Sequence, residues 1–130
     1  MGDAVTTWLL SGIGVYASAF MFRKARQAAQ GQLSEPSVVH TPAARTIGGV
    51  PNAAFGLIYY PLVALGTLAG LWLPAARLAT LGGASLAALF SLYLAYSLLF
   101  VTRRACPFCW TGHTANWLIW CLALHTLVTR

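Results

Sequence analysis

Long apolar stretches alternate with shorter polar ones along this chain. Four stretches, residues 5–22, 53–73, 78–101 and 105–128, contain no Asp, Glu, Lys or Arg. Each has at least the roughly 18 residues that a helix needs to cross a bilayer, and helices satisfy their own backbone polar groups in lipid. The pattern predicts an all-α integral membrane four-helix bundle, built as a single domain over residues 1–130.

The polar segments between these stretches differ greatly in length. Residues 74–77 and 102–104 are short connections, which force antiparallel neighbours. Residues 23–52 form a long loop between the first two helices, and loops of this length in compact domains are often functional. We expect it to cap the end of the bundle at which the last helix begins. Gly66, Gly70, Gly82 and Gly83 predict close packing between helices.

Composition excludes a water-soluble globule. The chain is 58% hydrophobic and 8% charged, whereas soluble domains carry about a quarter charged residues. The net charge of +6 comes from basic residues at helix ends and in one loop, as at membrane flanks. We therefore expect membrane lipid, and no nucleic acid, as the partner of this charge.

The distribution of basic residues bears on orientation. Six of them fall on the side of the long loop and the start of the last helix: Arg23, Lys24, Arg26, Arg45, Arg103 and Arg104. Arg77 and Arg130 fall on the other side. The positive-inside rule then favours a cytoplasmic location for the start of the last helix, in a cell (inner) membrane.

Two cysteines stand at the start of the last apolar stretch. Cys106, Cys109, His113 and Asn116 follow each other at intervals of three or four residues, so they share one stripe of a helix. The helix N-terminus and the two preceding arginines stabilise a thiolate, the nucleophilic form in disulfide exchange. Pro107 suits the first position of a helix, where its missing N–H costs nothing.

This spacing leaves three interpretations open: a redox pair, a zinc site or inert packing. A structural zinc site needs four convergent ligands, and Cys121 lies three turns deeper than the pair, so we name no metal ligand. Cys121 is expected to be a small apolar residue, and His125 to face headgroups or cap carbonyls.

Two motifs together resemble those of the vitamin K epoxide reductase family, particularly its bacterial and archaeal homologues. One is the Cys-Pro-Phe-Cys sequence at residues 106–109, and the other is the stretch TPAARTIGGVPNAAFGLIYY at residues 41–60. The resemblance spans nearly the whole chain, in helix number and in the position of the long loop.

The resemblance implies a quinone, menaquinone or ubiquinone and vitamin K-like, inside the bundle. Cys109 would face this quinone, and Cys106 would exchange with an incoming dithiol. Asn52 matches an asparagine that binds one quinone carbonyl. His113 occupies the place of a hydroxyl-bearing residue and would serve the other carbonyl. The pocket would be lined by Phe55, Tyr59 and Tyr60.

One departure concerns electron entry. Family members usually carry a second cysteine pair in the long loop, and residues 23–52 contain none here. The predicted function is a membrane thiol:quinone oxidoreductase that supports disulfide bond formation, with a thioredoxin-like or other dithiol protein as partner. The alternatives are a non-catalytic membrane subunit with a static disulfide, and a carrier of a soft metal ion.

Overall fold

A computed structural model describes residues 2–29, 31, 52–102 and 107–129. The elements are α1 (Gly2–Ala29), α2 (Asn52–Ala69), α3 (Pro74–Tyr96), the π-helix η3 (Ser97–Thr102) and α4 (Pro107–Thr129). Within this described part there are helices and no strands, so the prediction of an all-α bundle of four helices is confirmed. The cap was predicted over residues 23–52, of which residues 30 and 32–51 lie outside the described residues.

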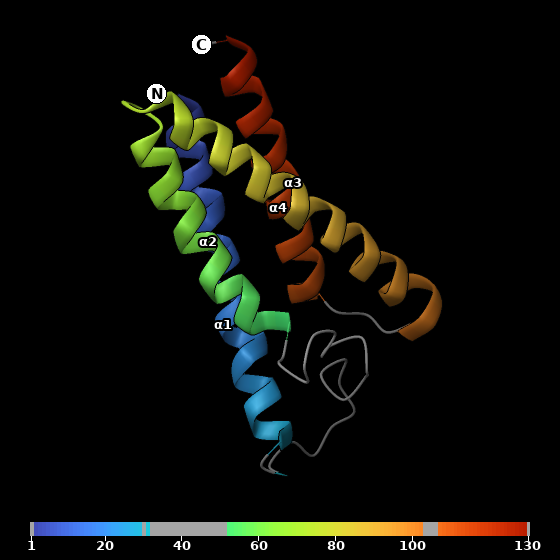
Figure 1. Ribbon diagram of the computed structural model, residues 1–130. Coiled ribbons are helices and arrows are strands. Elements are labelled where there is room, and N and C mark those ends of the chain that lie inside the picture. The colour runs from blue at the N-terminus through green and yellow to red at the C-terminus, as the bar shows by residue number, and fades with distance from the viewer. Residues whose placement is uncertain (1, 30, 32–51, 103–106, 130) are drawn as a thin grey trace.

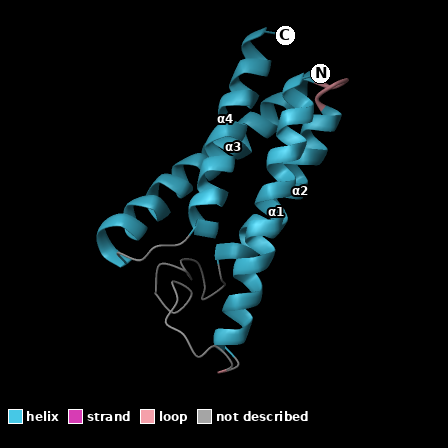
Figure 2. Cartoon of the chain, turned by 180° about the vertical axis from the view of Figure 1, so that it is seen from behind, coloured by secondary structure: helices cyan, strands magenta, loops and turns pink. Residues whose placement is uncertain are grey.

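The helices run alternately up and down. α1 packs against α2 and α4, and α3 packs against α4 and α2. The ends of α1 and α4 that carry the chain termini lie at the same end of the bundle (Figure 1). Towards η3, α3 diverges from α2, as both views show (Figures 1 and 2). The described part of the start of α4 lies at this wider end.

The outer surface of the bundle is apolar, as lipid requires. Leu9, Leu65 and Leu86 are each more than 60% exposed. Three segments are long and apolar enough to cross a membrane: Gly2–Gln27, Asn52–Ala69 and Pro74–Phe100. The described part of α4 has the length but not the apolar composition, because it carries two histidines and an asparagine. The protein is a multi-pass membrane protein.

Two predicted boundaries are wrong. α1 continues through residues 23–29, which we assigned to the loop, because Arg, Lys, Gln and Ala are good helix formers. The first glycine after this run, Gly31, adopts a left-handed conformation with φ 71°. Residues 74–77 are the first turn of α3 rather than a connection, since Pro74 is preorganised for a helix start. The connection is the turn at residues 70–73.

The glycines divide into two groups. A Cβ at Gly66 would meet Thr80, and one at Gly70 would meet Arg77, so these glycines do allow α2 and α3 to approach. Among the described residues, nothing lies within 4 Å of a Cβ built at Gly82 or at its neighbour in α3, Gly83. The prediction that these two glycines mark a packing face is therefore wrong.

The core lies where α1, α2, α3 and α4 meet. Tyr60, Val63, Ala84 and Ile119 form its buried cluster. The ring of Tyr60 lies directly against Gly14, where any side chain would overlap it. This close approach holds α1 and α2 together.

Candidate functional site

Cys109 lies in the first turn of α4, which begins at Pro107 as the sequence indicates. Cys109 is half-buried and disulfide-bonded. Cys106 lies outside the described residues. Cys121 is a free, exposed cysteine further along α4, which is compatible with a small apolar residue in lipid.

Phe108, which sequence reasoning gave no role, anchors the start of α4 on α1. Its ring stacks on that of Phe20 with centroids 3.9 Å apart and planes 16° apart, and the Tyr16 ring lies 6.3 Å away. The Lys24 ammonium lies over the same Phe20 ring, 5.4 Å from its centroid. An aromatic residue inside the cysteine motif was the available signal.

The π-helix η3 supplies a further neighbour of Cys109, Leu98. Leu98 is buried and packs with Cys109, Met21 and Trp110. π-helical turns are rare and occur often at functional sites. Cys109 therefore lies in an apolar setting built by α1, η3 and α4.

His113 lies between two indole rings on α4. Its ring centroid is 6.1 Å from Trp110, edge-on, and 6.1 Å from Trp117, stacked at 28°. The indole nitrogen of Trp117 donates to the Ala88 carbonyl of α3 at 3.4 Å. His113 thus belongs to an aromatic column that continues the stripe from Cys109 along α4.

The four predicted residues of α2 take different positions. Asn52 opens the helix, and Asn52, Phe55 and Tyr59 are partly buried on one face, at intervals of three and four residues. Tyr60 is 5% exposed, and its hydroxyl donates to the Gly112 carbonyl at 2.6 Å. Tyr60 therefore serves the core between α1, α2 and α4.

A buried hydrogen-bonded chain joins α2, α4 and α3. The Tyr59 hydroxyl donates to Oδ1 of Asn116 at 2.7 Å, and Nδ2 of Asn116 donates to the Ser91 hydroxyl at 2.7 Å. Asn116 was placed on the cysteine stripe by its spacing, but Ser91 carried no signal in the sequence. The chain ties α2, α4 and α3 together beyond His113 on α4.

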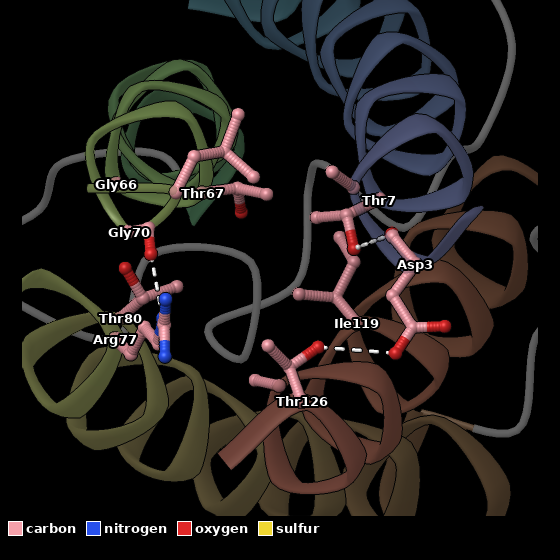
Figure 3. Close-up of a pocket in the computed structure, with 12 residues that line it drawn as sticks. Asp3, Thr7, Gly66, Thr67, Gly70, Arg77, Thr80, Ile119 and Thr126 are labelled. Carbon is pink, nitrogen blue, oxygen red and sulfur yellow. Dashed lines mark hydrogen bonds between the residues drawn. The ribbon is translucent and has the colours of Figure 1, made fainter. Parts of the chain in front are cut away.

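A pocket lies at the other end of the bundle, lined by all four helices (Figure 3). There Asp3 accepts from His125 at 2.6 Å and from Thr126 at 3.1 Å, which joins the first turn of α1 to the last turns of α4. Nε of Arg77 donates to the Gly70 carbonyl at 2.6 Å. The side chain of His125 is 61% exposed and pairs with Asp3, a partner that the sequence did not indicate, and its expected position facing headgroups stays a prediction.

The helices and the disulfide-bonded cysteine at the start of α4 define a multi-pass membrane protein with a thiol site. The sequence matches the vitamin K epoxide reductase family over residues 5–124. The chain therefore belongs to this family, and its class of activity is thiol–quinone oxidoreduction in a membrane. No curated protein matched the sequence.

Proposed function

We propose that this protein transfers electrons from a dithiol, through Cys106 and Cys109, to a bound menaquinone or ubiquinone, and so supports disulfide bond formation. The observation that carries the proposal is the position of Cys109, disulfide-bonded in the first turn of α4 and beside an aromatic column. In the net reaction a dithiol loses two electrons and two protons, and the quinone gains them as a hydroquinone.

The setting of Cys109 favours the reactive thiolate. The positive end of the α4 dipole stabilises a negative charge in its first turn. Arg103 and Arg104 precede the pair in the sequence, and Lys24 is held near the start of α4 by the stack of Phe20 on Phe108. In this proposal Cys109 faces the quinone and Cys106 exchanges with the partner.

Aromatic side chains on α4 and α2 would suit a flat, lipid-soluble ring. His113 and its flanking indoles offer aromatic faces, and Phe55 and Tyr59 add a partly buried aromatic wall on α2. Asn52 and His113 carry nitrogen atoms that can hydrogen-bond to the ring carbonyls. Quinone, when bound, supplies the two-electron acceptor, and the protein positions it.

Electron entry is proposed to be direct. Because residues 23–52 contain no cysteine, no relay pair exists in this loop, and a thioredoxin-like or other dithiol protein would attack the disulfide at Cys106. The attacking thiolate forms a mixed disulfide and releases the thiolate of Cys109, after which the second partner thiol displaces Cys106.

The test of this proposal is quinone reduction by the purified protein with a dithiol donor. Cys109→Ala is expected to abolish it, because no disulfide can then form at the start of α4. Cys121→Ala is the matched control and is expected to keep most activity, since Cys121 is free and exposed. A fully active Cys109→Ala variant would exclude the mechanism.

We further propose that the start of α4 faces the cytoplasm of a cell (inner) membrane. The count of basic residues, six against two, supports this orientation. Fusion of a reporter that is active only outside the cytoplasm, placed after Arg130, is expected to give an active reporter. A silent fusion that is well expressed would reverse the orientation.

A further inference from the structure

The chain from Tyr59 through Asn116 to Ser91 is buried inside the bundle. Asn116 is 4% exposed and Ser91 is 6% exposed. Both hydrogen bonds are 2.7 Å long. Buried polar groups that are fully paired hold one arrangement strongly, because an unpaired alternative costs the desolvation of each group.

This arrangement fixes the direction of the Tyr59 hydroxyl. Asn116 points its amide nitrogen at Ser91 and its carbonyl oxygen at Tyr59, so the phenol proton is committed to Asn116. A phenol has a single proton to donate. Towards any other group, the oxygen of Tyr59 can therefore only accept.

Tyr59 also belongs to the α2 face that carries Asn52 and Phe55, and its hydroxyl contacts α4 at Asn116. Asn116 is three residues beyond His113 and seven beyond Cys109, on the same stripe of α4. Tyr59 is likewise seven residues beyond Asn52 on the same face of α2. The hydrogen bond from Tyr59 to Asn116 therefore reaches α4 one helical turn from His113, which is proposed to bind the ring.

We propose that Asn116 is a positioning residue that holds Tyr59 as a hydrogen-bond acceptor, so that the site prefers a hydroquinone to the corresponding quinone. This inference rests on the proposed function. A quinone oxygen only accepts hydrogen bonds, so it forms none with an acceptor such as the Tyr59 oxygen. A hydroquinone hydroxyl donates, so Tyr59 can pair with it.

The consequence is a shift of the equilibrium between the protein-bound states towards reduced ring and oxidised cysteines, while the net equilibrium of the free reactants is unchanged. Oxidation of the dithiol releases two electrons and two protons, and the quinone takes up both pairs, so the reaction balances without a proton from Tyr59. Tighter binding of the hydroquinone draws electrons from the cysteines to the ring. It also predicts inhibition by the product.

The test compares equilibrium binding of menadione and menadiol, without oxygen, by quenching of tryptophan fluorescence in the purified protein. In Tyr59→Phe, menadiol affinity is expected to fall about three- to tenfold, with menadione affinity changed less than about twofold. In Asn116→Leu the proton of the Tyr59 hydroxyl is no longer directed to Asn116 and is free to turn towards the ring, so menadiol should bind more weakly and menadione more tightly. Menadiol product inhibition should weaken in both variants.

Ser85→Ala is the matched control. The Ser85 hydroxyl accepts from the Trp120 indole at 3.0 Å, so this variant also removes a hydrogen bond between α3 and α4, outside the proposed chain. Its menadiol-to-menadione affinity ratio should equal that of the wild type, and an equal change in this control would overturn the assignment. If Asn116→Leu does not fold, Tyr59→Phe carries the test.

Two further outcomes separate this inference from the proposed function. A Tyr59→Phe variant that binds both compounds with the wild-type ratio overturns the role of Tyr59 and leaves the proposed function standing. A wild-type protein that binds neither compound and reduces no quinone overturns both.

Discussion

The two ends of the bundle are joined in different ways. At the end where α4 begins, its described contacts with α1 and η3 are aromatic and apolar, through Phe108 on Phe20 and Cys109 beside Leu98. At the end where α4 finishes, Asp3 accepts hydrogen bonds from His125 and Thr126. We call these the Cys109 end and the Asp3 end.

This difference suits different tasks. At the Asp3 end, the carboxylate of Asp3 accepts a hydrogen bond from Thr126, which ties α1 to α4 (Figure 3). Aromatic stacking at the Cys109 end positions the start of α4 without using groups that can hydrogen-bond to a ligand. The contacts that place the start of α4 are therefore apolar, whereas those that place its last turns are polar.

The largest effect on this comparison is expected from Phe108→Ala. Loss of the stack on Phe20 leaves the first turn of α4 less well fixed on α1, so quinone reduction should fall at least about tenfold, as misplacement of reacting groups by an ångström can cost more than this. The pair itself contributes about 0.5–1.5 kcal/mol beyond its area, so the loss of stability should be small. Activity and thermal unfolding measured on the same preparation check both statements.

Phe90→Ala is the matched control for this variant. Phe90 also stacks on an aromatic ring, that of Tyr93, but both residues belong to α3 and the centroids are 6.3 Å apart. It should keep near wild-type activity. Equal loss of activity in both variants would mean that Phe108 has no special part in placing Cys109.

The sequence was sufficient for the helices and insufficient for their ends. Runs without charge located all four helices, because lipid excludes charged groups. The extension of α1 through residues 23–29 was missed since charged helix formers look like a membrane flank, and the same residues can be either. Gly82 and Gly83 were misassigned because a small residue permits close packing without requiring it.

For the candidate site, spacing within one helix was informative and contacts between helices were not. Cys109, His113 and Asn116 are spaced by three and four residues, which predicts one stripe of a helix. α4 is helical over all three residues, so they share that stripe. The partner of Asn116 on α3, Ser91, depends on how two helices cross, which no local pattern encodes. The pairing of Asp3 with His125 joins residues 122 positions apart and was invisible for the same reason.

The smallest effect is expected at the Asp3 end. Asp3→Asn should lower the free energy of unfolding only slightly, because the side chains of His125 and Asp3 are 61% and 32% exposed and exposed pairs contribute little. Quinone reduction should stay at the wild-type level, since this end lies on the far side of the bundle from Cys109. Unfolding and activity assays in the same detergent measure the two quantities.

Two threonines of the last helical turns sharpen this last prediction. Thr126→Val removes a hydrogen bond to Asp3, whereas Thr129→Val removes one to the His125 carbonyl within α4. The losses of stability in Asp3→Asn and Thr126→Val should be less than additive, because both alter the same hydrogen bond. The losses in Asp3→Asn and Thr129→Val should add. A loss of quinone reduction in Asp3→Asn with unchanged stability would contradict the separation of the two ends, because it would give the Asp3 end a part in the reaction.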